Sequence, residues 1–391
     1  MLGIPAAGPG GRAGARSNLM RYVLPGIQLE SECPLDDFRA FISEAPSDLP
    51  LCTLRFRREP FPDRSAAQSI SHANLLITEL ADGWLYRLAG VRDCALHVSR
   101  DYARFTAYLT AATPRTELLM PLIRTALECA SIGQGVLSLH SACVTLDGQA
   151  LCLTAASGTG KSTRALCWQT GLQARILSGD RPALRLRDGK VWACGVPWDG
   201  KEQLYINACV PLLAICHIRR GVQTYLRRLS PRQARRVLTQ QCFIPMWDLD
   251  AAAAAMLLIR RLCHAVPLYR ATCGPDESAA KEVWDLVFRH PESIMEMEHA
   301  MKLKQGFALR NIAGEHIVMP TGENIRKFDG AIVLNPVAAF IWETLSEGCS
   351  REELLQAILA EYEIDRAQAE QDLDSLLETL RGYQVLEEDP V

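Results

Sequence analysis

The stretch Ala155-Ala156-Ser157-Gly158-Thr159-Gly160-Lys161-Ser162-Thr163 decides how this chain is interpreted. It follows an apolar run, 150–154, and precedes a run compatible with a helix, 164–170. A strand, a glycine-rich loop, a Lys-Ser/Thr pair and a helix in this order are typical of a phosphate-binding loop, because glycine lets backbone N–H groups surround phosphate oxygens. The stretch departs from the full motif at one position, where Ala155 replaces the first glycine.

The polar residues of this loop have expected roles in binding ATP and Mg²⁺. Lys161 is expected to reach the β- and γ-phosphates, and the Ser162 hydroxyl is expected to bind Mg²⁺. The other residues that we expect to line the nucleotide are Ser157, Gly158, Thr159, Gly160 and Thr163. ATP and Mg²⁺ are therefore the expected cofactors.

Composition limits the classes of partner and the compartment. The net charge of −3 gives no broad indication of nucleic acid, and no run of about 18 apolar residues predicts a membrane span. The 14 cysteines lie between Cys33 and Cys349 without a C-x-x-C pair, which predicts buried free thiols in a reducing cytoplasm rather than a zinc site or a disulfide framework. We expect a cytoplasmic protein with no nucleic-acid or membrane partner.

Two Asp-Gly pairs between β-rich runs indicate the kind of sheet that holds the loop. Asp147-Gly148 and Asp188-Gly189 each predict a tight hairpin. Hairpins join antiparallel strands, so the sheet is expected to be antiparallel or mixed, unlike the parallel sheet of Ras-like proteins. The predicted division of the chain is a disordered lead, an N-terminal mixed α/β region, a kinase domain, a linker and a C-terminal domain, over 1–19, 20–114, 115–290, 291–305 and 306–391.

Seven arginines between Arg219 and Arg236 form a basic group whose role the residues leave open. It could contact phosphate or an acidic peptide, or it could pair with the acidic C-terminal section. Nucleic-acid binding is the weakest interpretation, because the group lacks interleaved aromatic residues apart from Tyr225.

The middle of the chain resembles the catalytic domain of HPr serine kinase/phosphorylase and its kinase-like relatives. The matching residues are Leu139-His140-Ser141-Ala142, Ser157 to Thr163, Ser178-Gly179-Asp180 and Val196 to Lys201. The resemblance implies a phosphate-binding loop in a mainly antiparallel sheet and transfer from ATP to a serine hydroxyl. It also implies that His140 and Asp180 act in catalysis beside Lys161. Whether Asp180 is the base or a Mg²⁺ ligand stays open, and Gly179 replaces the first of two acids usual in that family.

The last section resembles PqqD-like domains, which recognise the leaders of ribosomally made peptides. The matching residues are Leu334-Asn335, Ala338 to Leu345, Glu347-Gly348, Leu354, Tyr362, Asp372 and Leu376 to Leu380. The resemblance implies three strands, three helices and a leader peptide bound as an added edge strand. The expected partner is thus a precursor peptide whose leader binds to about residues 306–388.

The predicted fold is α/β (α+β). A P-loop kinase domain of HPr kinase type on a mixed, mainly antiparallel sheet is followed by a small β3α3, winged-helix-like PqqD domain. The predicted function is an ATP-dependent kinase that phosphorylates a serine of a precursor peptide. The alternative is a nucleotide-binding scaffold, or pseudokinase, that binds the leader for other enzymes. The oligomeric state stays open, with a homo-oligomer among the alternatives.

Overall fold

The computed structural model describes most of the chain in two compact units. The described residues are 19–45, 47–61, 69–72, 74–110, 116–155, 161–198, 204–221, 224–274, 276–291, 294, 301–326, 328, 330–346 and 348–388. Unit 1 comprises 1–154, 174–215 and 235–266, and unit 2 comprises 155–173, 216–234 and 267–391. The expected disordered lead, apart from Leu19, lies outside the described residues. The predicted domain boundaries stay predictions.

Unit 1 begins with an eight-stranded sheet of order β1-β2-β3-β8-β7-β6-β5-β4. Its strands are β1 (Met20–Leu24), β2 (Ile27–Ser31), β3 (Leu51–Arg57), β4 (Ser69–His72), β5 (Leu75–Leu80), β6 (Gly83–Leu88), β7 (Cys94–Ser99) and β8 (Arg104–Leu109). Along β3, buried and less buried residues alternate, as expected of a strand with one covered face. We expected a mixed α/β region here, and its described residues form these strands and one 3-10 helix, η1 (Asp36–Phe41).

A second, nine-stranded sheet contains the two predicted hairpins. The strands are β9 (Val136–Ser138), β10 (Ser141–Leu146), β11 (Gln149–Thr154), β12 (Arg175–Ser178), β13 (Ala183–Arg187), β14 (Lys190–Cys194) and β15 (Cys209–Arg220), in the order β12-β10-β11-β15-β14-β13-β9. Both Asp-Gly pairs have positive φ, 51° and 75° at Asp147-Gly148 and 51° and 72° at Asp188-Gly189. These values fit the two-residue turns that match the strand twist, so the hairpin predictions are confirmed.

Two helices of unit 1 pack on these sheets. Helix α1 (Met120–Ile132), preceded by η2 (Thr116–Leu118), contacts β6, β7 and β9. Helix α4 (Leu249–Ala265) contacts α1 and β9, and the Asp248 carboxylate caps it by accepting from the N–H groups of Asp250 and Ala251. Helix α3 (Pro231–Gln241) includes residues of both units.

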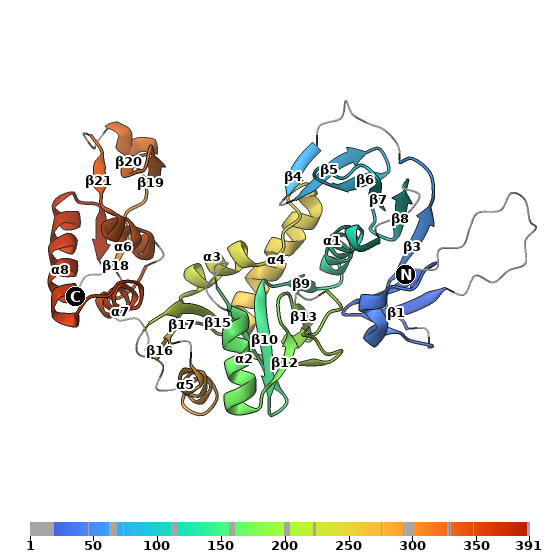
Figure 1. The fold of residues 1–391 in the computed structure, drawn as a ribbon, viewed down its shortest axis with the longest axis horizontal. Helices are drawn as coiled ribbons and strands as arrows, with labels where there is room; N and C mark the ends of the chain where they lie inside the picture. The colour runs from blue at the N-terminus through green and yellow to red at the C-terminus, as the bar shows by residue number, and fades with distance from the viewer. Residues whose placement is uncertain are drawn as a thin grey trace, which may run out of the picture. The chain divides into compact units, whose positions relative to one another are not determined.

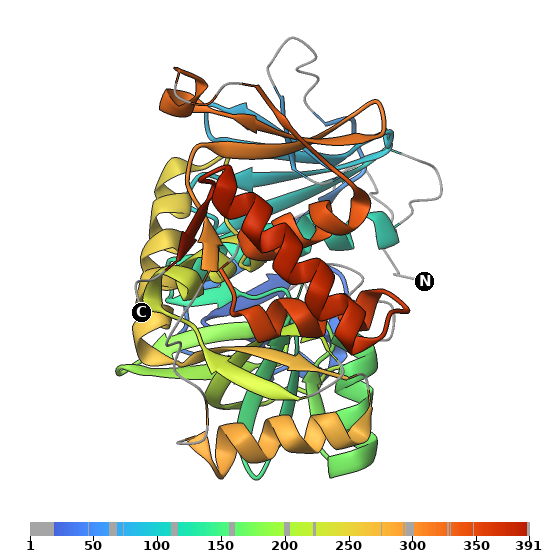
Figure 2. The same cartoon turned by 90° about the vertical axis from the view of Figure 1, so that its left-hand side faces the viewer.

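Unit 2 holds the helix that follows the predicted phosphate loop. Helix α2 (Lys161–Leu172) lies beside α5 (Glu277–Phe288), as Figures 1 and 2 show. Trp168 meets Trp284 edge to face between them, with ring centroids 5.8 Å apart. Strand β17 (Leu268–Cys273) pairs with β16 (Tyr225–Arg228) and with β15. The buried Arg164 of α2 donates to the carbonyl of Cys273 at 3.1 Å, which ties α2 to β17.

The C-terminal part of unit 2 has its own core. Its elements are β18 (Met301–Leu303), β19 (Phe307–Ile312), β20 (Glu315–Pro320), η4 (Gly322–Arg326), β21 (Ile332–Leu334), α6 (Pro336–Ser346), α7 (Arg351–Glu361), α8 (Arg366–Gly382) and β22 (Leu386–Glu388). Figure 1 shows the sheet β19-β20-β21 and the three helices of this part. Trp342, Leu354 and Leu377 are buried in its core. Within the predicted linker, 301–303 form β18 and pair with β22.

One cysteine expectation is corrected by the structure. Cys194 and Cys209 are directly opposite on the antiparallel strands β14 and β15, and a disulfide joins them. Sequence spacing could not show this, because the pair is created by strand register. Of the other 12 cysteines, ten are buried. No helix in the described ranges is long and apolar enough to cross a membrane.

Candidate active site

Two neighbouring stretches of chain, β9 to β10 and β12 to β13, are each interrupted between their two strands. The predicted catalytic residues lie in these interruptions. β10 pairs antiparallel with β12, and β9 pairs antiparallel with β13. β9 precedes β10 in the chain, and β12 precedes β13, so the four strands form one long interrupted ladder. His140 lies in one interruption and Asp180 in the other. The run 136–146 is therefore not one continuous strand, because it is divided at 139–140.

The interruption brings His140 and Asp180 side by side. His140 Nε2 lies 3.5 Å from Asp180 Oδ1, and each side chain is 31% exposed. Imidazole and carboxylate can exchange or share a proton at such a site while solvent and substrate still reach both. The predicted pair is therefore brought together within unit 1.

Backbone contacts hold both residues although the ladder is interrupted. The N–H of Ser141 donates to the Asp180 carbonyl at 2.8 Å, and the N–H of His140 donates to the Gln241 carbonyl at 2.8 Å. The Thr154 hydroxyl donates to the His140 carbonyl at 2.9 Å. Thr154 is the last residue of β11, so the end of the strand before the predicted phosphate loop is bonded directly to the His140 backbone. These bonds satisfy polar groups that a broken ladder would leave unpaired.

Gly179, the residue before Asp180, has a backbone role. Its N–H donates to the Leu204 carbonyl at 2.9 Å, and its neighbour Ser178 bridges to Tyr205. A glycine at 179 offers no second carboxylate beside Asp180. The observed pair therefore contains a single acid.

A further glycine supports the segment before Asp180. A Cβ placed on Gly195 would lie 1.9 Å from the carbonyl oxygen of Ile206 and 2.9 Å from that of Leu177. Leu177 belongs to β12, the strand that leads to Asp180. Only glycine allows these backbones to approach so closely.

Two charged residues near Asp180, Arg181 and Glu128, were not predicted as part of the site. Arg181 Nε lies 3.8 Å from Asp180 Oδ2, and Arg181 Nη1 lies 3.8 Å from Glu128 Oε1. Burial raises the pKa of the Glu128 carboxyl, and the guanidinium groups of Arg181 and Arg124 oppose that rise. The available signal in the sequence was a lone carboxylate, Glu128, between the apolar residues Leu127 and Cys129.

Lys161, the predicted phosphate-binding lysine, lies at the start of helix α2. It is the first residue of α2, and its Nζ donates to the carbonyl of Ala155 at 3.1 Å, both within unit 2. The ammonium group is thus held at the N-terminal end of a 12-residue helix, where the helix dipole also favours anions.

The rest of the loop is only partly described. Ser157, Gly158, Thr159 and Gly160 lie outside the described residues, and so does the side chain of Ser162. Thr163 is the third residue of α2 and is exposed. The roles of these residues in binding nucleotide and Mg²⁺ stay predictions.

Two of the seven arginines pair with the C-terminal section. Arg227 Nε lies 3.0 Å from Glu353 Oε1 with both side chains buried, and Arg220 lies 3.7 Å from Glu361 at an exposed position. Arg227 and Arg270 also donate to the carbonyl of Gly348. The alternative in which the basic group pairs with the acidic C-terminal section is therefore observed for these arginines.

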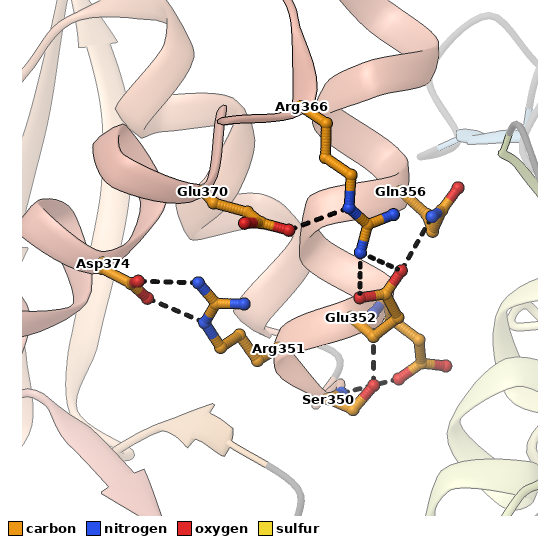
Figure 3. Close-up of polar contacts among 8 residues, drawn as sticks. Ser350, Arg351, Glu352, Gln356, Arg366, Glu370 and Asp374 are labelled. Atoms are coloured by element: carbon orange, nitrogen blue, oxygen red, sulfur yellow. Dashed lines mark hydrogen bonds and ion pairs between the residues drawn. The ribbon is translucent and has the colours of Figure 1, made fainter. Parts of the chain in front are cut away.

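Helix α7 is fixed at its start by side-chain contacts (Figure 3). The Ser350 hydroxyl accepts from the N–H of Glu353, and the Glu353 carboxylate accepts from the N–H of Ser350, which is the predicted capping box. Arg351 binds Asp374 of α8 through two bonds of 2.7 Å each. These contacts hold α7 and α8 together.

Comparison with known proteins identifies the C-terminal section. Residues 315–386 match the sequence model of the family described as coenzyme PQQ synthesis protein D (PqqD). The predicted PqqD-like domain is thus confirmed. None of the curated proteins matches the chain.

Three solved structures are similar to parts of the chain. TbiB1 in complex with the TbiA(beta) leader peptide is 30% identical, and the alignment covers 22% of this chain and 94% of that chain with a TM-score of 0.20. A lasso peptide synthetase B1 complexed with the leader peptide is 23% identical, covering 22% and 96% with a TM-score of 0.20. The Hpr(Ser) kinase/phosphatase from Coxiella burnetii is 8% identical, covering 40% and 96% with a TM-score of 0.23.

Proposed function

We propose that this protein is an ATP-dependent kinase that phosphorylates a serine hydroxyl of a ribosomally made precursor peptide. The observation that carries the proposal is the His140–Asp180 pair, 3.5 Å apart at the interruption of the ladder. A strand, β11, and a helix that begins at Lys161 flank the glycine-rich sequence, as the phosphate-loop motif requires. Precursor peptides are made by ribosomes, so the proposed location is the cytoplasm.

The chemistry assigns one task to each described residue. The serine oxygen attacks the γ-phosphorus of ATP, the bond from that phosphorus to the bridging oxygen breaks, and ADP leaves. Asp180 accepts the proton of the serine hydroxyl, and His140 orients the carboxylate through Oδ1. Lys161 offsets the negative charge of the phosphates.

The proposed Mg²⁺ site needs only one or two ligands from the protein. In phosphoryl-transfer sites this ion is usually bound by one or two carboxylates together with phosphate oxygens. No group of three or more His, Cys, Asp or Glu side chains in the described ranges could hold a metal. We propose that Ser162 and phosphate oxygens would hold the ion, which when bound neutralises charge on the phosphates. Because Asp180 Oδ2 already faces Arg181, we favour the role of base for Asp180.

The PqqD-like domain supplies a means of capturing the peptide. Its described sheet ends in two edge strands, β19 and β21, and each pairs with β20 alone. A leader can add to such an edge through backbone hydrogen bonds, with side chains providing specificity. Val333 of β21 is 65% exposed and offers an apolar contact there. Capture on the same chain raises the effective concentration of the acceptor serine near the kinase.

Two departures from the kinase pattern support the scaffold alternative. Ala155 replaces a loop glycine, and Gly179 removes one acid. A scaffold would bind the leader without transferring phosphate. The two functions therefore predict different products from the same mixture.

The proposal is tested by the intact mass of candidate precursor peptides encoded near this gene, incubated with ATP, Mg²⁺ and the full-length protein. The kinase predicts a gain of about 80 Da, absent with Lys161→Ala and Asp180→Asn. Val333→Glu should weaken peptide binding, and excess peptide should restore its activity. Leader binding without any mass gain would support the scaffold and contradict the kinase.

A further inference from the structure

Helix α1 of unit 1 holds a carboxylate in a place where charge is costly. The side chain of Glu128 is 2% exposed, and its neighbours Leu127 and Cys129 are buried too. A buried carboxylate is tolerated only when cations or hydrogen bonds compensate for its lost hydration. The groups that compensate the charge of Glu128 therefore indicate what this carboxylate does in the structure.

Two arginines face Glu128 from different elements. Arg124, one helical turn earlier on α1, lies 4.0 Å from Oε2, and Arg181, from the β12–β13 connection, lies 3.8 Å from Oε1. A contact with Ser138 also favours the charged carboxylate, whereas the nearby charge of Asp180 opposes it. Glu128 is thus joined to the strand connection that holds Asp180.

Arg181 contacts two carboxylates at once. One end of its guanidinium faces buried Glu128, and its Nε lies 3.8 Å from Asp180 Oδ2. The other oxygen of Asp180 is the one that faces His140. Pro182 follows Arg181 and restricts the backbone of both residues, and its carbonyl accepts from the N–H of Leu139 at 3.2 Å.

We propose that Arg181 is a positioning residue for Asp180, and that Glu128 holds Arg181 in place from the interior of unit 1. This inference rests on the proposed kinase function. Arg181 fixes the orientation of the Asp180 carboxylate, so that one oxygen points to His140 and the pair keeps the alignment that proton transfer needs. Small misplacements of a reacting group reduce rates strongly, by about 10²-fold for 1 Å.

The test compares Arg181→Lys, Arg181→Gln and Glu128→Gln in the full-length protein with the matched surface variant Arg187→Gln. Arg187 is 67% exposed, pairs with Asp188 and lies outside the site. We expect kcat to fall about 10- to 100-fold in Arg181→Gln and Glu128→Gln, with less than about a threefold change in KM for ATP. Arg181→Lys should recover part of the loss, and Arg187→Gln should match the wild type.

A second readout follows the Glu128 carboxyl by NMR. The Arg181 guanidinium opposes the raised pKa of Glu128, so Arg181→Gln should raise that pKa further. This titration measures the contact without activity, and Arg181→Gln should fold because Arg181 is 27% exposed. An active wild type with an unchanged kcat in folded Arg181→Gln, or an unchanged Glu128 pKa, would overturn the positioning role alone. A wild type that transfers no phosphate to any candidate peptide would overturn the kinase proposal, and the positioning role with it.

Discussion

Arg227 Nε lies 3.0 Å from Glu353 Oε1, and the two residues are 126 positions apart in the chain. Their side chains are 4% and 1% exposed, so the pair is inside unit 2 rather than on its surface. Arg227 belongs to β16, and Glu353 closes the capping box of α7 in the PqqD-like domain. The start of α7 is therefore fixed to β16, and β16 pairs with β17, which also receives Arg164 from α2.

The first prediction concerns the stability of this joint. Removing one partner of a buried pair leaves the other uncompensated, so Glu353→Gln should lower the free energy of unfolding by about 3–5 kcal/mol. The exposed pair Arg220–Glu361 is the matched control, and Glu361→Gln should change it by about 0–1 kcal/mol. Chemical denaturation measures both. Equal effects of the two substitutions would contradict a buried joint.

The second prediction concerns truncation of the chain after residue 305. Without 306–391, Arg227 loses Glu353 and both Arg227 and Arg270 lose the carbonyl of Gly348. The shortened protein should unfold at a lower temperature than the full chain and bind less nucleotide per mole. Thermal denaturation and nucleotide binding check this. A fragment as stable as the full chain would contradict it and would make truncation a valid test of leader capture.

The third prediction concerns Gly195. Gly195→Ala places a Cβ against the backbone oxygens of Ile206 and Leu177, so we expect a clear loss of stability with disturbance of β12. Gly133→Ala is the matched control, because its Cβ would meet nothing within 4 Å and its φ is −60°. The control should be neutral or stabilise by about 0.4–1 kcal/mol. Thermal denaturation of the two variants tests this prediction. Similar melting temperatures would contradict the close approach of Gly195 to the backbone oxygens of Ile206 and Leu177.

The fourth prediction concerns pH. Burial, together with the charge of Arg181, lowers the pKa of His72 below its ordinary value of 6.5, and His72 packs against Phe243 and Trp247. The folded protein thus favours neutral imidazole. This contribution to stability is present above about pH 6.5 and is lost as the pH falls through the folded pKa.

His72→Phe keeps an aromatic ring and removes the titration. Between about pH 7 and pH 5 the wild type should lose more stability than His72→Phe. His97→Phe is a control, because the His97 ring contacts Asp82 instead. Parallel stability curves for the wild type and His72→Phe would contradict a lowered pKa.

The elements with strong local signals were predicted correctly from the sequence. The two Asp-Gly pairs predicted both hairpins, and each pair has the positive φ values that such turns need. In each case the information lies within a few neighbouring residues. The His140–Asp180 contact was expected only through a family resemblance, since 40 residues separate the two in the chain.

The remaining features depend on tertiary structure. The Cys194–Cys209 disulfide follows from strand register, and the Arg227–Glu353 pair follows from the packing of segments far apart in sequence. Glu128 was overlooked because a lone acid in a helix usually faces solvent. Strand β18 was missed because its partner β22 lies at the other end of the domain.

The most direct test of the central claim is single-turnover transfer of labelled phosphate from ATP to a serine of an unphosphorylated candidate precursor peptide. It compares the wild type, Asp180→Asn and Asp188→Asn. Asp188 is an exposed turn residue, so the same chemical change there should leave the rate unaltered. The account predicts a rate about 10²–10⁴-fold lower in Asp180→Asn. An Asp180→Asn protein that transfers phosphate as fast as the wild type would contradict the assignment of His140 and Asp180 as the catalytic pair.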